Sequence, residues 1–140
     1  MSDKLIETLK RHEGVRSHVY LCSAGYETIG VGRNIADSGL GLSDDEIDYL
    51  LSNDIKRVDA ELAYAYPWYN DLDQVRKEAM INLSFNLGQT RLQKFVKALD
   101  RMAGHAYGEA ANEFMDSLWA KQVGSRAVEV TEMIRTGEYQ

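Results

Sequence analysis

Hydrophobic residues recur at helical spacing near the N-terminus and over most of the second half of the chain. Over residues 3–13 the apolar side chains fall on one helical face, Ser2 or Asp3 can cap the start, and Gly14 ends the segment. Residues 14–42 differ, because six of the eleven glycines fall within the first 41 positions and β-forming residues lie between them. The pattern predicts one helix followed by a region of short strands and tight turns.

In the remainder of the chain, residues that start or stop helices divide the sequence into a series of helices. Ser43 and Glu46 form a Ser-x-x-Glu capping box at a helix start. Pro67, the single proline, interrupts the helical pattern, and Gly88 is a further stop. Helices are predicted, in chain order, over residues 44–63, 71–87, 90–103, 106–118 and 125–136.

These elements predict an α+β fold in one domain of 140 residues. A small β-lobe over about 14–42 is joined by the connecting helix 44–63 to a helical lobe over 64–140, to which helix 3–13 is added. A cleft between two such lobes is where a ligand is expected.

Composition narrows the possible partners. A formal charge of −6 argues against nucleic acid, because phosphate binding requires a basic face. The same charge opposes binding to any anionic polymer unless salt screens it. No apolar run approaches the roughly 18–20 residues of a membrane span, and the N-terminus has no signal-peptide core. We therefore expect a cytosolic protein without membrane insertion, and its single cysteine excludes an internal disulfide.

An acid, a thiol and a hydroxyl follow one another within a short stretch that begins at the end of the first predicted helix. Glu13 is followed after eight residues by Cys22, and Cys22 after five residues by Thr28. Glycoside hydrolysis requires a proton donor and a second group that activates water or attacks the sugar carbon. Glu13 suits the first task, because the negative end of a helix dipole favours a neutral carboxyl. Alternatively, Glu13 is a solvated glutamate at a helix end.

Several short motifs follow one another along the chain in a defined order and at defined spacings. They are Glu13-Gly14-Val15-Arg16, Gly25-Tyr26, Thr28-Ile29-Gly30-Val31-Gly32, Asp73-x-Val75-Arg76, Ile81-Asn82-Leu83-Ser84-Phe85-Asn86-Leu87-Gly88, Trp119, Gln122, Arg126-Ala127 and Arg135-Thr136-Gly137. In this order they resemble the phage-type lysozymes, a family of glycoside hydrolases. The likeness covers nearly the whole chain and is interrupted around residues 34–43, where the β-lobe is shorter.

The resemblance implies roles for the three candidate groups. Glu13 is the acid, Thr28 helps to hold the attacking water, and Cys22 takes a place more often held by aspartate. A lone buried cysteine is otherwise an inert small hydrophobe. As a thiolate, Cys22 could activate water with inversion or attack the anomeric carbon with retention.

The charge state of Cys22 depends on its neighbours. Close to the acid Glu13, the thiolate is disfavoured unless Arg16, His18 or Arg33 compensates for its charge. The sequence leaves this compensation open.

The resemblance also implies supporting residues. Phe85 and Asn86 fall where the family lines its cleft, Asn34 is a further substrate-binding candidate, and Arg126 matches an arginine that pairs with the catalytic glutamate. Phe85 could equally be a core residue, and Arg126 a surface arginine.

The implied function is that of an endolysin. It would hydrolyse the β-1,4 bond between N-acetylmuramic acid and N-acetylglucosamine in peptidoglycan, as a monomer and without metal or cofactor. It would accumulate in the host cytoplasm and reach the wall after another protein permeabilises the membrane. Two alternatives remain: a weak or inactive peptidoglycan-binding or phage structural module, and a generic helical interaction domain.

Overall fold

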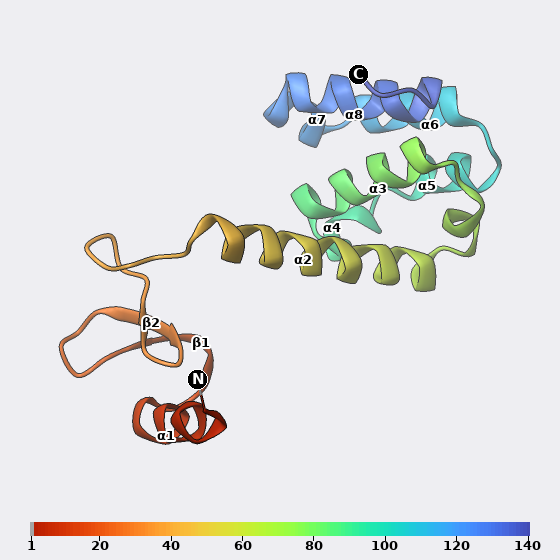
Figure 1. The fold of residues 1–140 in the computed structure, drawn as a ribbon. Helices are drawn as coiled ribbons and strands as arrows, with labels where there is room; N and C mark the ends of the chain where they lie inside the picture. The colour runs from red at the N-terminus through yellow and green to blue at the C-terminus, as the bar shows by residue number, and fades with distance from the viewer. Residues whose placement is uncertain (1) are drawn as a thin grey trace. The chain divides into compact units, whose positions relative to one another are not determined.

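The computed structural model describes residues 2–140, and these residues form two compact units. The first unit runs to Leu51 and the second from Ser52 to Gln140. Helix α2 (Asp44–Ala65) continues across this boundary (Figure 1). The first unit contains a small antiparallel sheet and the second is helical, so the predicted α+β class is confirmed. The organisation as one lysozyme-like domain stays a prediction.

Helix α1 (Asp3–Glu13) opens the first unit with the predicted bounds. The Ser2 hydroxyl accepts a hydrogen bond from the Leu5 amide at 3.3 Å, which satisfies one of the free amides of the first turn. Gly14 follows at φ 80°, a conformation that glycine adopts without strain. Glu13 is therefore the last helical residue before the chain turns toward the sheet.

Three short strands form one antiparallel sheet in the order of the chain: β1 (Arg16–Leu21), β2 (Glu27–Gly30) and β3 (Arg33–Asn34). Thr28 on β2 pairs with Tyr20 on one side and with Asn34 on the other. The β1–β2 register shifts between Arg16 and Tyr20, which marks an irregularity in β1. The predicted β-region is confirmed, and Thr28 lies in its central strand.

Polar bonds connect β3 to the start of α2. Glu46 and Ser43 form the predicted capping box, with amide-to-side-chain distances of 3.3 and 2.9 Å. The same Glu46 oxygen accepts a hydrogen bond from Arg33 at 2.6 Å, and Arg33 also donates to the Gly41 carbonyl at 3.0 Å. Arg33, followed by the Ser43 contacts, lowers the pKa of Glu46 to about 2. This network fixes the loop between the last strand and the long helix.

The second unit departs from the predicted helix bounds at α3. Pro67 ends the preceding helical pattern as predicted and begins a short 3-10 helix, η1 (Pro67–Asp71). Helix α3 (Gln74–Leu87) then starts at residue 74 rather than 71, so the predicted start is wrong. Asp73 is the reason, because its carboxylate accepts a hydrogen bond from the Arg76 amide at 3.1 Å and caps the helix.

The predicted helix 90–103 is divided into α4 (Gln89–Leu92) and α5 (Val96–Ala103). Tight backbone bonds interrupt it, including one from the Phe95 amide to the Leu92 carbonyl at 3.0 Å. The break allows the Phe95 ring to pack near Phe114 and Trp119, with centroid distances of 5.4 and 6.4 Å. Packing of one aromatic ring thus overrides the helical pattern.

The predicted helix 106–118 is also too long. Helix α6 (Tyr107–Met115) ends earlier, and α7 (Leu118–Val123) begins with Ser117 as its cap, whose hydroxyl accepts from the Ala120 amide at 3.2 Å. Helix α8 (Ser125–Thr136) has the predicted bounds.

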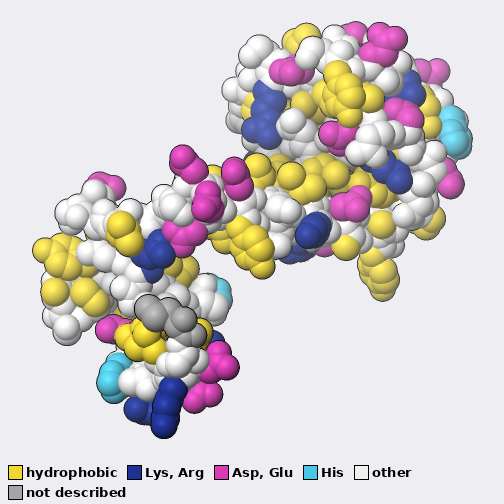
Figure 2. All heavy atoms as spheres, in the orientation of Figure 1, with side chains coloured by type: hydrophobic (Ala, Val, Ile, Leu, Met, Phe, Trp, Pro, Cys, Tyr) yellow, Lys and Arg dark blue, Asp and Glu magenta, His cyan; other side chains and the backbone are white. Residues whose placement is uncertain are grey.

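One hydrophobic core fills the second unit. Its fully buried larger side chains are Leu62, Tyr69, Met80, Leu83, Leu92, Met102, Phe114, Val130 and Ile134. Charged side chains of both signs are scattered over the visible surface among polar and hydrophobic ones, and acidic ones gather where α2 begins (Figure 2).

Candidate active site

Cys22 follows β1 directly and opens a tight turn. The Gly25 amide donates to the Cys22 carbonyl at 2.8 Å, and the Cys22 amide donates to the Tyr26 carbonyl at 3.0 Å. Gly25 completes the turn at φ 85°, where a side chain would be strained. The turn places the half-buried Cys22 among backbone amides.

These amides favour the charged form of the thiol. The amide of Tyr26 contributes most, followed by that of Ala24, and together with the Thr28 hydroxyl and the Gly25 amide they lower the pKa of Cys22 below its ordinary value of 9.0. Partial burial acts in the opposite direction. Because hydrogen-bond donors stabilise a thiolate, Cys22 has the surroundings of a reactive thiol.

The three basic residues considered as compensating charges make other contacts. Arg33 pairs with Glu46 at 2.6 Å, the Arg16 guanidinium lies 5.4 Å from the Tyr20 ring centroid, and His18 contacts the hydroxyl of its neighbour. The compensation comes instead from backbone groups. No side-chain motif marks such groups, although the glycine turn after Cys22 is a weak signal.

Thr28 lies beside Cys22. Its hydroxyl donates to the Tyr26 carbonyl at 2.8 Å, and this carbonyl also accepts the Cys22 amide at 3.0 Å. Thr28 is only 3% exposed. The structure therefore joins Cys22 and Thr28, two of the predicted site residues, through one backbone carbonyl.

Glu13 lies against Gly32, in the turn that follows β2, whereas the Cys22 turn precedes β2. A Cβ added to Gly32 would stand 2.8 Å from Oε2 of Glu13, so the glycine leaves room for the carboxylate. Gly32 falls between β2 and β3, four positions after Thr28. Glu13, Cys22 and Thr28 thus all belong to the first unit and border one three-stranded sheet.

Asn34, a predicted substrate-binding residue, pairs with Thr28 across the sheet. Its side-chain oxygen accepts a hydrogen bond from the Ala36 amide at 3.0 Å, and its carbonyl accepts from the Gly41 amide at 3.0 Å. Asn34 therefore shapes the loop after β3, next to the candidate catalytic group.

Phe85 lines a cavity of about 490 Å³ in the second unit and is 41% exposed. Arg57 also lines this cavity, where it forms ion pairs with Asp54 at 2.7 Å and with Glu61 at 3.7 Å. Phe85 is therefore not a core residue, and its contact with sugar stays a prediction.

Asn86 and Arg126 connect helices within the second unit. The Asn86 side-chain oxygen accepts a hydrogen bond from the Trp119 indole nitrogen. Arg126 donates to the Asn82 side-chain oxygen through Nη2 at 2.8 Å and through Nε at 3.0 Å. The pairing of Arg126 with Glu13 stays a prediction.

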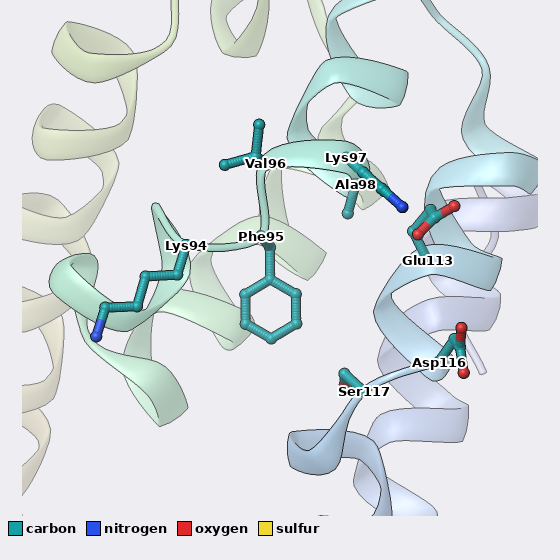
Figure 3. Close-up of a pocket in the computed structure, with 8 residues that line it drawn as sticks. All are labelled: Lys94, Phe95, Val96, Lys97, Ala98, Glu113, Asp116 and Ser117. Carbon is teal, nitrogen blue, oxygen red and sulfur yellow. The ribbon is translucent and has the colours of Figure 1, made fainter.

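The sequence did not indicate a further cavity of about 320 Å³ in the second unit (Figure 3). The Phe95 ring projects toward it, and Lys97 and Glu113 lie on two different helices at its edge. None of the residues that line this cavity is one of the motif residues of the β-region.

Within residues 2–140, no group of three or more His, Cys, Asp or Glu side chains could hold a metal ion. None of the helices in this range combines the length and the apolar character needed to cross a membrane.

Comparison with known proteins gives one consistent family. Residues 10–135 match the family model described as phage lysozyme. An endolysin of Acyrthosiphon pisum secondary endosymbiont phage 1 is 32% identical, over 90% of this chain and 85% of that protein. A probable T4-type lysozyme of Dictyostelium discoideum is 27% identical, over 98% of this chain and 96% of its own length.

A third relative is larger. The pre-baseplate central spike protein of Enterobacteria phage T4 is 27% identical over 95% of this chain, and the chain spans only 28% of the length of that spike protein.

Proposed function

Because the chain belongs to the phage lysozyme family, which makes it a glycoside hydrolase, we propose that it cleaves the β-1,4 bond between N-acetylmuramic acid and N-acetylglucosamine in peptidoglycan. One observation carries this proposal. The first unit holds Glu13 against Gly32 after β2 and Cys22 in the turn before β2, so that both border the strand that carries Thr28.

Each group has a defined task in this proposal. Glu13, the exposed carboxyl at the end of α1, protonates the oxygen of the leaving sugar. Cys22 acts at the anomeric carbon, and the amides around its sulfur support the thiolate that this step requires. From the family resemblance, Phe85 and Asn86 are proposed to bind sugar and Arg126 to support Glu13.

Two chemical routes are open to Cys22. As a base it takes a proton from water, and the water attacks with inversion as the leaving sugar departs. As a nucleophile the thiolate displaces the leaving sugar from the anomeric carbon, water then displaces the sulfur, and the product retains its configuration. NMR of the first released sugar distinguishes them, because an inverted anomer requires the water route and a retained anomer the covalent route.

We also propose the biological setting of an endolysin. The enzyme accumulates as a monomer in the cytoplasm of the bacterial host and reaches peptidoglycan after another protein permeabilises the membrane, so that hydrolysis lyses the cell. The similarity to an endolysin and to T4-type lysozymes along most of their lengths supports this setting.

The second candidate is a wall-binding or phage structural module with little turnover. The similarity to the spike protein is the observation in its favour. The thiolate-supporting turn at Cys22 favours the enzyme, because a binding module has no need of a reactive thiol.

The test is release of muropeptides from purified peptidoglycan. After borohydride reduction, mass spectrometry should find muramitol rather than glucosaminitol at the new ends, which identifies the cleaved bond. Glu13→Gln should lower the rate by roughly 10²–10⁴-fold. Glu7→Gln, on the same helix and also exposed, should keep the wild-type rate. Binding without release of fragments would instead favour the structural module.

A further inference from the structure

The cavity of about 320 Å³ in the second unit has an apolar floor. The half-buried Phe95 ring projects toward it and packs near Phe114 and Trp119, at centroid distances of 5.4 and 6.4 Å (Figure 3). The buried Ala98 and the exposed Val96 line the cavity as well. Its volume lies at the lower end of the range of ligand pockets, which begins at roughly 300 Å³. The floor therefore suits a short alkyl chain.

Charged side chains of both signs border this cavity. Lys97 lies on α5, whereas Glu113 lies on α6 and Asp116 follows the end of that helix. The Lys97 ammonium and the Glu113 carboxylate point toward one another at the edge of the cavity, while Lys94 points away from both (Figure 3). Residues three apart on a helix are neighbours on its surface, so the two carboxylates lie on the same side of the cavity.

These three charged groups are available to a ligand. The ion pairs formed within residues 2–140 include none of Lys97, Glu113 and Asp116. An attraction between exposed charges is worth little, so Lys97 and Glu113 compete only weakly with a ligand for one another. A cation and two anions around an apolar floor are complementary to a ligand with a carboxylate and an ammonium at the end of an alkyl chain.

The peptides of peptidoglycan contain such a group. They are attached to the muramic acid, and where they include a diamino acid with a free distal end, one carbon of that end bears both an ammonium and a carboxylate. An alkyl chain joins this carbon to the peptide.

We propose that the cavity binds this free end of a diamino acid in the peptide of the substrate. Lys97 binds its carboxylate, and Glu113 and Asp116 bind its ammonium. The alkyl chain lies against the Phe95 ring. This inference rests on the proposed function, because it takes peptidoglycan as the substrate. It adds recognition of the peptide to an enzyme whose proposed chemistry concerns the glycan.

Binding is measured by two-dimensional NMR of the isotope-labelled full chain, titrated with a soluble stem tripeptide that ends in meso-diaminopimelate. Amide signals of residues 94–98 and 113–117 should shift. The same tripeptide with the distal carboxylate amidated should bind about threefold to tenfold more weakly, because the charge-assisted bond to Lys97 is lost. A tripeptide that ends in lysine, which lacks this carboxylate, should be weakened to a similar degree. Equal binding of the three peptides, or shifts confined to other residues, would overturn the proposal.

Substitutions assign the two charges separately. Lys97→Met should bind the diaminopimelate peptide only as tightly as its amidated form, and Glu113→Gln should weaken all three peptides, since each keeps the ammonium. Lys121→Met is the control, because Lys121 is an exposed lysine on α7 outside the cavity lining. It should keep the preference of the wild type. The NMR spectra also show whether each variant is folded, and a folded Lys97→Met variant with the full preference would contradict the role of Lys97.

Hydrolysis distinguishes a failure of this inference from a failure of the proposed function. On peptidoglycan with diaminopimelate peptides, Lys97→Met should raise KM about threefold to tenfold and leave kcat unchanged, because the cavity binds substrate away from the reacting atoms. On peptidoglycan with amidated diaminopimelate, the variant and the wild type should have equal KM. A wild type that binds the tripeptide but releases no fragments would contradict the proposed function and support the peptide site. A wild type that hydrolyses peptidoglycan without shifts at the cavity would overturn the peptide site alone.

Discussion

At the scale of single residues, the space beside Glu13 depends on the absence of one side chain. Gly32 has φ 73°, and a Cβ there would meet Oε2 of Glu13 at 2.8 Å. Gly32→Ala should therefore displace the carboxylate and lower the rate of wall hydrolysis at least about tenfold, because small displacements of a catalytic group are costly. The measurement is the initial rate per folded molecule.

Gly30 provides a matched control. It has a similar φ of 70° but nothing within 4 Å of an added Cβ. Both alanine variants should lose about 1–2 kcal/mol of stability, since both force a left-handed backbone on alanine. Only Gly32→Ala should also show a lower rate of hydrolysis per folded molecule. Equal losses of activity in the two variants would show that backbone strain, and not Glu13, is responsible.

Only those parts of the candidate site that consist of side chains could be predicted from the sequence. The spacing of Glu13, Cys22 and Thr28 indicated one site, and the structure links the last two through the Tyr26 carbonyl. The amides that favour the thiolate could not be predicted, because every residue has an amide and only the folded turn directs several of them at one sulfur. The burial of Thr28 was missed for a similar reason, since it depends on pairing with two strands.

At the scale of secondary-structure elements, Glu46 joins a strand and a helix through one carboxylate. Its folded pKa is about 2 against an ordinary value of 4.5, mainly because of Arg33. A lowered pKa means that the ion pair stabilises the folded state above pH 4.5, and that this stabilisation is lost as the pH falls from 4.5 toward 2. Glu46→Gln should thus be less stable than wild type at neutral pH, and the difference should vanish near pH 2. Urea unfolding followed by circular dichroism measures both.

Asp45→Asn is the corresponding control, because Asp45 lies in the same first turn of α2 and shares its helix dipole. Its difference from wild type should be smaller than that of Glu46→Gln at neutral pH. A similar loss in both variants would attribute the effect to the helix dipole rather than to the contact with Arg33.

Element boundaries were predictable where local chemistry decides them. The capping box at Ser43 and Glu46 and the stop at Gly14 depend on neighbouring residues, and both were confirmed. The break before α5 was not predictable, because its cause is the packing of Phe95 near rings from α6 and α7, which are distant in sequence. Tertiary packing overrides a helical pattern in such cases.

At the scale of the whole molecule, Arg76 connects α3 to the end of the chain. It donates to the carbonyls of Ile134 at 2.6 Å and Arg135 at 3.1 Å, and its guanidinium lies 4.0 Å from the Tyr107 ring centroid. Lysine cannot reproduce these directed bonds. Arg76→Lys should therefore lower the free energy of unfolding of the second unit by about 2–3 kcal/mol.

Tryptophan fluorescence during urea unfolding measures this loss, since both tryptophans lie in the second unit. Arg101→Lys is the control, because Arg101 is 49% exposed and pairs with the exposed Glu109 at 3.2 Å. It should change stability by no more than about 0.5 kcal/mol. An Arg76→Lys variant as stable as this control would mean that the carbonyl contacts contribute little.

The net charge of −6 has a consequence for an enzyme that acts on an anionic wall. Like charges slow the encounter, and salt shortens their reach to roughly 10 Å at 0.1 M. The initial rate on purified peptidoglycan should therefore rise as sodium chloride increases from roughly 10 to 150 mM. Uncharged chitin oligosaccharides, where they are cleaved, should show no such rise. A rate on peptidoglycan that falls steadily with salt would mean that local basic groups such as Arg57, and not the total charge, govern the approach to the wall.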